Sequence, residues 1–308
     1  MSTEGGTKAV LAALIANAGI AVSKFVAFFI TGSTSMLAEG VHSVADSGNQ
    51  VLLLFGGRRS QRVPDSEHPF GYGRTRYVYA FVVAVVLFVV GGGYSLYEGW
   101  HKIQHPEEIS SPVVAFVVLL VAIGLESFSF RTAYVEANRS RGPHSLLAYI
   151  RRTRQPELPV VLLEDLGALV GLVFALIGVT LAVVTGDGRW DGLGAMAVGT
   201  LLVCIAVFLA LEMGSLLVGE GALPEQAEAV RRAVESTPGV NRVIHLRTLH
   251  TGPDEILVGV KIAVTHDDTA ASVARTIDDA EARIRGAVPT ARWIYVEPDL
   301  ERTSPSGG

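Results

Sequence analysis

The sequence predicts an α-helical membrane protein: six transmembrane helices followed by a small cytosolic α/β domain. Of the 308 residues, 49% are apolar and only 18% are charged, and the mean hydropathy is +0.40. Such a composition is typical of membrane proteins. The character changes to that of a soluble protein near residue 220. We therefore expect a transmembrane domain over 1–219, a cytosolic dimerisation domain over 220–300, and a disordered tail over 301–308.

Six apolar segments are each long enough to cross a hydrocarbon core of about 30 Å, which takes about 20 helical residues. They are 9–30, 34–55, 77–99, 112–133, 158–184 and 194–217. The first is longer than the core of a signal peptide, and residues 30–33 make a poor cleavage site, so we expect it to be retained. The single Cys204 leaves no disulfide framework and no thiolate cluster for a metal.

Charges between the spans predict the orientation. Residues 56–76 and 134–157 each carry five arginines, whereas the other three connections hold only Lys102 and Arg189. Because positive loops stay in the cytosol, both termini should be cytoplasmic. We expect a multi-pass integral protein of a prokaryotic plasma membrane. The net charge of −5 comes mostly from the C-terminal segment, and we expect no nucleic-acid partner.

The C-terminal segment has the pattern of a small two-layer α/β domain. Pro224 opens an amphipathic helix, and Pro238-Gly239 ends it. Two alternating, β-branched runs follow, joined at Gly252-Pro253, which is typical of a hairpin. A second amphipathic helix over 269–288 and a short strand over 291–298 complete the order αββαβ. Such a small domain benefits from a partner surface, so we expect a dimer.

Ionisable residues inside two spans indicate a metal ion within the membrane. His42 and Asp46 lie in the second span, and Glu164 and Asp165 lie side by side in the fifth. Such side chains cost roughly 2.5–3.5 kcal/mol each on the insertion scale, so they face a partner, an ion or a water-filled cavity. Imidazole with carboxylates is a ligand set for a divalent metal. A spacing of four turns a helix by about 400°, which places His42 and Asp46 on one face.

Four stretches of the chain resemble the cation diffusion facilitator family of metal/proton antiporters. They are GSTSMLAEGVHSVADSGNQ, DSEHPFGYGRTRY, VVLLEDLGALVG and LHTGPDEILV. The AEGxHSxxD and LLED signatures are most similar to the branch that includes animal zinc transporter nine. The resemblance covers essentially the whole chain. It implies a homodimer that carries a divalent transition metal, Zn²⁺ first, out of the cytosol in exchange for protons, with no resident cofactor and no enzymatic activity.

The resemblance also implies a ligand set. The family takes two residues from the second span and two from the fifth, each pair four apart. These positions are His42, Asp46 and Asp165, with Val161 where many relatives have His or Asp. Because protons and metal compete for the same ligand atoms, proton binding would release the ion.

A fourth ligand is left open. Glu39 lies on nearly the same helix face as His42, whereas Glu164 points about 100° away from Asp165. The candidates are Glu39, Glu164, Asn17, Asn49 and water. Glu126 in the fourth span is either a polar residue of a cavity or a hydrogen-bonding residue of the bundle, and we expect the second.

Two further metal positions of the family are altered. In the loop between spans two and three, relatives often have Asp-x-x-His-x-x-x-His, and this chain has Asp65, His68 and Tyr72. A phenol loses its proton only near pH 10, so we expect no stable site there. In the C-terminal domain, relatives' histidine positions fall on Ile244, Val260 and Tyr295. We therefore expect a dimerisation scaffold that needs no zinc.

Other readings remain open. A family member could carry Fe²⁺, Mn²⁺, Co²⁺ or Cd²⁺, because one His with oxygen ligands discriminates poorly among these metals. An intramembrane metalloenzyme or a non-transporting sensor are alternatives from other classes. The pair His42 and Asp46 is not a His-Glu-x-x-His motif, and no nucleophile–base pair accompanies it. Finally, Arg74 and Glu220 both lie at the cytosolic surface. Arg74 either only follows the positive-inside rule, which we favour, or pairs with Glu220 to orient the membrane and C-terminal parts.

Overall fold

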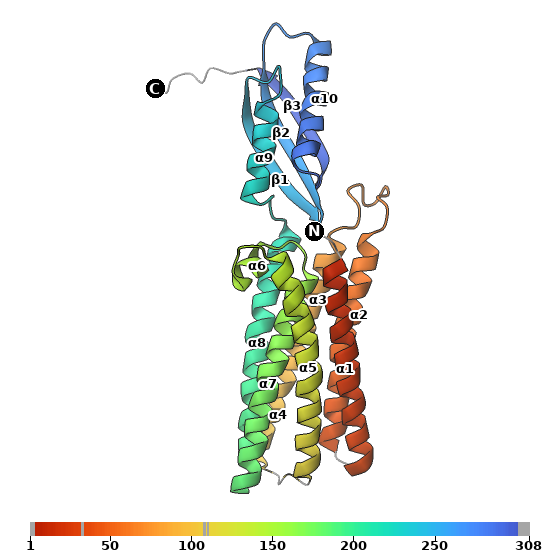
Figure 1. Cartoon of the computed structure of the whole chain (residues 1–308), viewed down its shortest axis with the longest axis vertical. Coiled ribbons are helices and arrows are strands. Elements are labelled where there is room, and N and C mark those ends of the chain that lie inside the picture. The colour runs from red at the N-terminus through yellow and green to blue at the C-terminus, as the bar shows by residue number, and fades with distance from the viewer. Residues whose placement is uncertain (1–3, 32–33, 107–108, 110, 301–308) are drawn as a thin grey trace, which may run out of the picture. The chain divides into compact units, whose positions relative to one another are not determined.

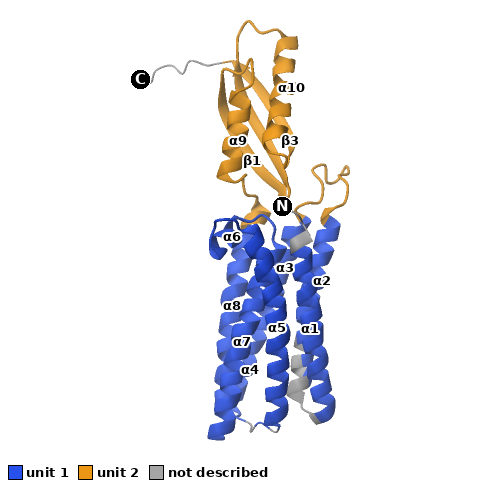
Figure 2. Cartoon of the chain, viewed as in Figure 1, with its two compact units in different colours: residues 1–59, 75–214 blue, residues 60–74, 215–308 orange. Residues whose placement is uncertain are grey.

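The structure is a computed structural model that describes residues 4–31, 34–106, 109 and 111–300. The side chains of residues 4, 5, 31, 34–36, 38, 39, 41 and 42 lie outside that description. The elements follow one another as drawn in Figure 1. The chain divides into two compact units, one of residues 1–59 and 75–214 and one of residues 60–74 and 215–308 (Figure 2).

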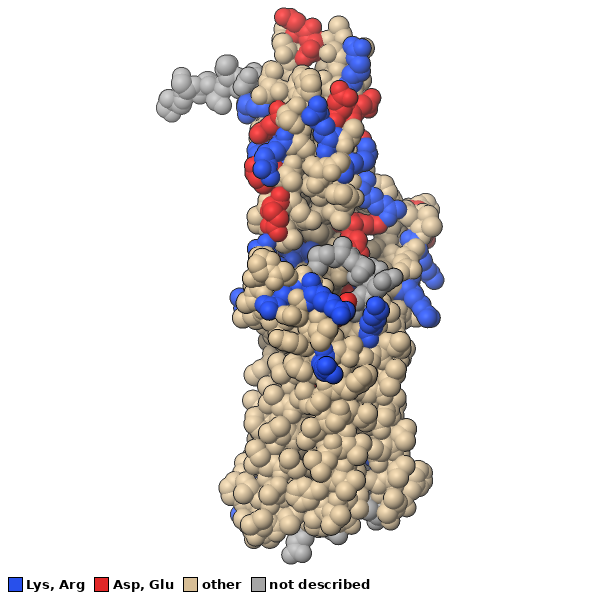
Figure 3. Space-filling model, viewed as in Figure 1, with Lys and Arg blue, Asp and Glu red and all other residues tan. Residues whose placement is uncertain are grey.

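The first unit is a bundle of long helices. They are α1 (Glu4–Thr31), α2 (Thr34–Ser60), α3 (Thr75–Val86), η1 (Leu87–Gly93), α4 (Tyr94–Gln104), α5 (Pro112–Ser140), α6 (Leu146–Arg152), α7 (Glu157–Thr185) and α8 (Arg189–Val218). On the face drawn in Figure 3, this unit shows few charged side chains over most of its length, and Lys and Arg gather near one end. That distribution is typical of a surface that faces lipid.

Five segments among the described residues are long and apolar enough to cross a membrane. They are Gly6–Ile30, Thr75–Gln104, Pro112–Ser140, Glu157–Thr185 and Arg189–Val218. The predicted helical membrane domain is therefore confirmed. The remaining expected span, α2, is a helix of 27 residues that carries the His42 and Asp46 positions and ends with Arg58 and Arg59 in its last turn. The count of six spans stays a prediction.

The third membrane segment is not a plain α-helix. The chain runs from α3 through a π-helical stretch, η1, into α4 without a break. Helical periodicity alone did not predict this stretch. A π-helical turn widens the helix by one residue and shifts which side chains face a neighbour. Here the wide turn ends in Gly91-Gly92-Gly93, which brings the backbone close to α8.

Glycines make the contact between this segment and α8. A Cβ on Gly92 would lie 2.6 Å from Val203 Cγ2, and a Cβ on Gly199 would lie 2.7 Å from the Leu96 nitrogen. A Cβ on Gly99 would lie 2.7 Å from the backbone oxygen of Gly192. Real Cβ atoms do not approach so closely, so these positions admit only glycine without a shift of the helices. Glycine at these positions lets the two helices pack closely.

The second unit has the predicted αββαβ order. Its elements are α9 (Pro224–Glu235), β1 (Arg242–Gly252), β2 (Glu255–Val264), α10 (Ala270–Ala287) and β3 (Ala291–Leu300). The sheet order is β1-β2-β3, with β1 antiparallel and β3 parallel to the central β2. The tight turn after Gly252 joins β1 to β2 as a hairpin, as the sequence predicted.

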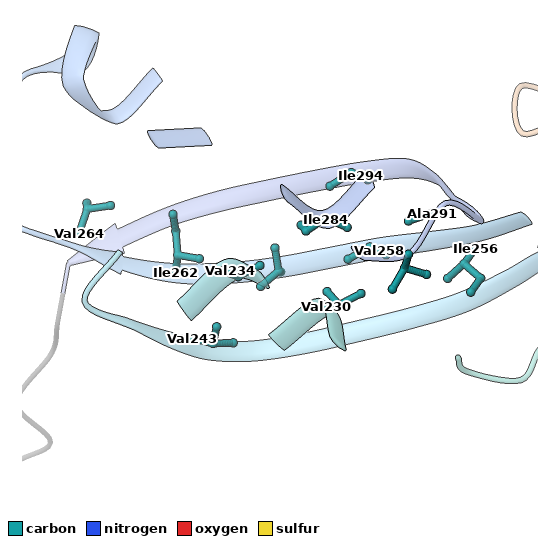
Figure 4. Close-up of a cluster of buried hydrophobic side chains, with 12 residues drawn as sticks. Val230, Val234, Val243, Ile256, Val258, Ile262, Val264, Ile284, Ala291 and Ile294 are labelled. Carbon is teal, nitrogen blue, oxygen red and sulfur yellow. The ribbon is translucent and has the colours of Figure 1, made fainter. Parts of the chain in front are cut away.

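The core of this unit lies between the sheet and both helices (Figure 4). Ile256, Val258 and Ile262 project from one face of β2, because alternate residues of a strand share a face. Val230 of α9 and Ile284 of α10 pack on them. Each such fully buried side chain contributes about 1.5–3 kcal/mol. The unit thus has an apolar core of its own.

Residues 60–74, which connect α2 to α3, pack on this second unit. The Phe70 ring meets the Trp293 ring of β3 edge to face, with centroids 5.6 Å apart. A Cβ on Gly73 would lie 2.7 Å from the Thr251 oxygen and 2.8 Å from the Gly252 Cα. The boundary predicted at residue 219 makes this loop only a link between spans. The aromatic contact and the close backbone approach instead make the loop part of the C-terminal unit.

The glycine contact on α8 leads to a first prediction. Gly199→Ala should lower the stability of the purified protein by about 1–3 kcal/mol, because the added methyl group overpacks the contact with Leu96. Thermal unfolding in detergent measures this change. Gly214→Ala is the matched control on the same helix, since a Cβ there would meet nothing within 4 Å. Equal melting temperatures for the two variants would contradict the proposed contact.

Candidate metal centre

Asp165 lies in the interior of the helical unit. It sits on α7, its side chain is 1% exposed, and its Oδ2 accepts a hydrogen bond from Ser129 Oγ of α5 at 2.6 Å. A hydroxyl that donates to a carboxylate fixes its orientation, as partners of metal ligands commonly do. Val161, one turn earlier on α7, is fully buried and apolar. Asp165 is thus held in place, and Val161 offers no ligand.

Glu164, the neighbour of Asp165, is bound by amides of α2. Its Oε1 accepts from Asn49 Nδ2 at 3.1 Å, and its Oε2 accepts from Gln50 Nε2 at 3.0 Å. Gln50 Oε1 in turn accepts from Asn17 Nδ2 of α1 at 3.3 Å. All four side chains are buried. These bonds connect α1, α2 and α7, so in this arrangement Glu164 joins helices.

Asp46 of α2 is half-buried. It interacts electrostatically with Glu164 of α7 and with Glu126 of α5. The side chains of His42 and Glu39 lie outside the described residues, so only the helical spacing places them relative to Asp46. Among the side chains that the structure describes, no three His, Cys, Asp or Glu residues are arranged to hold a metal ion. The proposed ligand set therefore stays a prediction.

Lys24 lies inside the first span, and the sequence pattern predicted no role for it. Lys24 of α1 donates from Nζ to Ser43 Oγ of α2 at 3.0 Å. It also interacts electrostatically with Glu126. The signal was present in the sequence, because a basic residue within an apolar span needs a polar partner. This positive charge lies next to the helix that carries Asp46.

A buried ion pair joins the first turns of two other helices. Arg76 Nε of α3 donates to Glu157 Oε1 of α7, and both side chains are less than 10% exposed. Removing one partner of a buried pair costs about 3–5 kcal/mol, because the other charge stays buried. In the sequence, Arg76 is only one of the loop arginines that predict the orientation in the membrane. Nothing in the local pattern linked it to a residue 81 positions away.

The loop residues Asp65, His68 and Tyr72 form a hydrogen-bonded turn. Asp65 Oδ2 accepts from the Tyr72 hydroxyl at 2.6 Å, and its Oδ1 accepts from the backbone N–H of His68 at 2.8 Å. The Tyr72 bond, followed by the His68 bond, lowers the pKa of Asp65 below its ordinary value. The same contact raises the pKa of Tyr72. Tyr72 thus acts here as a hydrogen-bond donor to Asp65.

The altered histidine positions of the C-terminal unit serve other purposes. Val260 is buried in the core of the sheet, whereas Tyr295 is exposed on β3. Ile244 falls at an irregularity of β1, where the register with β2 shifts. His250 is buried, with Nδ1 at 3.3 Å from the Gly252 oxygen.

The possible pairing of Arg74 with Glu220 concerns two residues of the second unit. A Cβ on Gly219 would lie 3.2 Å from Arg74 Nη2, so the guanidinium lies beside the residue that precedes Glu220. The Glu220 backbone oxygen accepts from the His250 backbone N–H at 2.8 Å. The ion pair itself stays a prediction.

Comparison with known proteins identifies the family. Residues 10–218 match the family model described as the cation efflux transmembrane domain, and residues 222–299 match the cation efflux protein, cytoplasmic domain. The chain therefore belongs to the cation efflux family, and the resemblance to cation diffusion facilitators is confirmed.

Individual relatives come from animals and bacteria. The chain is 33% identical over 258 residues to the mitochondrial proton-coupled zinc antiporter SLC30A9 of Xenopus laevis, which covers 83% of this chain and 46% of that protein. It is 34% identical over 244 residues to the human protein of that name, covering 79% and 43%. It is 27% identical over 254 residues to the cation-efflux pump FieF of Serratia proteamaculans, covering 81% and 78%. The chain thus spans less than half the length of these vertebrate relatives.

The loop geometry leads to a second prediction. Tyr72→His should create a zinc site, because an imidazole beside Asp65 and His68 supplies the third ligand that the phenol does not. Calorimetric titration of the purified protein should then detect one further bound zinc ion. Tyr72→Phe is the control: it removes the hydroxyl without adding a ligand. If both variants bind the same number of zinc ions, the interpretation of this loop is wrong.

Proposed function

We propose that this protein exchanges Zn²⁺ for protons across a membrane and carries the metal out of the cytosol. The observation that carries the proposal is Asp165, a buried carboxylate held by Ser129 inside a bundle of apolar helices. A carboxylate in such surroundings calls for a cation or a proton. The names of the vertebrate relatives, proton-coupled zinc antiporters, support the same exchange.

The proposed ligands are His42, Asp46 and Asp165. Two helices, α2 and α7, supply them, and the Asn49 and Gln50 bonds to Glu164 hold those two helices together. A metal needs ionised carboxylates and neutral imidazole, so protons arriving at these atoms displace it. Competition for the same atoms couples the two fluxes. Glu39 and Glu164 remain the candidates for a further ligand.

Release on the other side requires helices to move. Glycines line the contacts of α8 with α4 and with α7, where a Cβ on Gly178 would lie 2.9 Å from the Trp190 oxygen. Such smooth contacts let helices slide, whereas interlocked large side chains resist sliding. Alternating access of this kind is the pattern expected of secondary transporters. We propose that α8 slides along α7 during the cycle.

The other functional classes have less support. The relatives are named as antiporters and efflux pumps, which favours transport over a metalloenzyme or a sensor. We propose Zn²⁺ rather than Fe²⁺, Mn²⁺, Co²⁺ or Cd²⁺ as the transported metal, because the vertebrate relatives are named as zinc antiporters. The prediction of a prokaryotic plasma membrane receives no support from those relatives, which are named as mitochondrial, and stays a prediction.

We propose that the protein works as a dimer joined through its C-terminal unit. That unit has its own core but is small, about 80 residues by the matched family range, and small domains gain stability from a partner surface. The bilayer, the metal ion and protons are its other partners.

The transport proposal leads to a third prediction. His42→Ala, Asp46→Ala and Asp165→Ala should each reduce metal uptake to background in proteoliposomes with a pH gradient, because each removes a ligand. The assay compares Zn²⁺ with Mn²⁺, Fe²⁺, Co²⁺ and Cd²⁺. Glu136→Ala is the control, since this carboxylate lies on α5 and pairs with Arg139 at 3.5 Å. Normal uptake by a folded Asp165→Ala protein would refute the site, and transport of Mn²⁺ or Fe²⁺ without Zn²⁺ would refute the choice of metal.

The C-terminal unit leads to a fourth prediction. The fragment from Gly221 to Gly308 should fold and dimerise in the presence of a metal chelator, because Val260 and its apolar neighbours form the core without any metal. Light scattering after size-exclusion chromatography gives the mass, and circular dichroism gives the fold. Tight, stoichiometric zinc binding to this fragment would contradict the prediction.

A further inference from the structure

Glu126 of α5 is a buried carboxylate that no assigned role explains. It is 5% exposed, and its Oε2 has no hydrogen-bond partner among the described residues. Nearly all buried polar atoms in folded proteins have a partner, so each exception calls for an explanation, such as an unseen ion. For a carboxylate the natural missing partner is a cation, since both of its oxygens are acceptors when it is ionised.

Residues of the proposed metal centre surround Glu126. It interacts electrostatically with Asp165, Glu164 and Asp46, which belong to α7 and α2. Ser129, three residues further along α5 and so on the same helix face, donates its hydrogen bond to Asp165. The face of α5 that carries Glu126 therefore points at the aspartate of α7. Lys24 of α1 also acts on Glu126 and offsets one of these four negative charges. Carboxylates gathered in an apolar interior repel one another unless further cations lie among them.

A second buried oxygen without a hydrogen-bond partner among the described residues lies on α2. Asn49 of α2 uses its Nδ2 to bind Glu164, and its Oδ1 has no hydrogen-bond partner among the described residues. Asn49 is 1% exposed and follows Asp46 by three residues. Carboxylate and amide oxygens are ligands for divalent cations. Two buried oxygen acceptors therefore lack a partner among the described residues: Oε2 of Glu126 on α5 and Oδ1 of Asn49 on α2. Both residues interact with Glu164 of α7.

We propose that Glu126 is a ligand of the transported cation, so that α5 contributes to the site together with α2 and α7. This inference rests on the proposed transport function. Glu126 would supply an anionic oxygen to a site in which Val161 of α7 offers no ligand. It also makes the site richer in oxygen than two histidines and two aspartates would be, which suits a divalent cation accepted with modest selectivity. The role expected from the sequence, a hydrogen bond within the bundle, leaves Glu126 Oε2 without a partner among the described residues.

The test compares four variants of the 308-residue chain in detergent by calorimetric titration with Zn²⁺: Glu126→Gln, Glu126→Asp, Glu136→Gln and Asp165→Ala. Glu126→Gln keeps the shape of the side chain but removes its charge, and it should raise the dissociation constant by about 100-fold or more. Even the loss of a residue that only orients a metal ligand lowers metal affinity by about 10–100-fold. Glu126→Asp keeps the charge but withdraws the carboxylate, and it should weaken binding less. Glu136→Gln on the same helix should bind as the wild type does.

The outcomes separate this inference from the transport proposal. An unchanged dissociation constant in Glu126→Gln, with binding lost in Asp165→Ala, would overturn the role of Glu126 alone. Wild-type affinity in Glu126→Asp together with weak binding in Glu126→Gln would also overturn it, because charge rather than ligation would then matter. A wild-type protein that neither binds nor carries any metal would overturn the transport proposal itself.

Discussion

The interior of the helical unit is governed by one constraint: a buried carboxylate in an apolar bundle must find a partner on another helix. Glu164 meets it with the two amides of Asn49 and Gln50, and Asp165 meets it with the hydroxyl of Ser129. Because these partners lie on α2 and α5, the acidic residues of α7 fix the relative positions of three helices. Asn17 extends the connection to α1 through Gln50. Each hydrogen bond removes the large free-energy cost of leaving a buried polar group unpaired, and adds a modest net stability of its own.

The contacts of α8 follow a different rule. Gly92 and Gly99 of the third membrane segment face Gly199 and Gly192 of α8, where backbones touch with no room for a side chain. Contacts of this kind depend on shape alone and break no hydrogen bond when they slide. The bundle thus combines one group of helices tied by polar bonds with a seam made of glycine. Under the proposed transport function, a cation that enters the polar group would change the charges there, and the seam would let the helices respond.

The sequence predicted the αββαβ unit and the apolar spans because both follow from local periodicity and length. It also indicated Asp46 and Asp165, since a charge in a span is visible without a structure. It did not indicate Ser129 or Gln50, because their importance lies in contacts between residues 36 and 114 positions apart. The packing of Phe70 on Trp293 was missed for the same reason.

Where the family often places ligands outside the membrane, this chain has residues with contacts of their own. Tyr72 gives its hydroxyl to Asp65, and Val260 packs in the core of the sheet. Neither contact needs a metal, so the loop and the C-terminal unit hold their shape through hydrogen bonding and burial. The unpartnered oxygens of Glu126 and Asn49, in contrast, lie within the bundle. Carboxylates from α2, α5 and α7 thus gather in the bundle near the positive charge of Lys24 of α1, and the demand for a further cation is concentrated there.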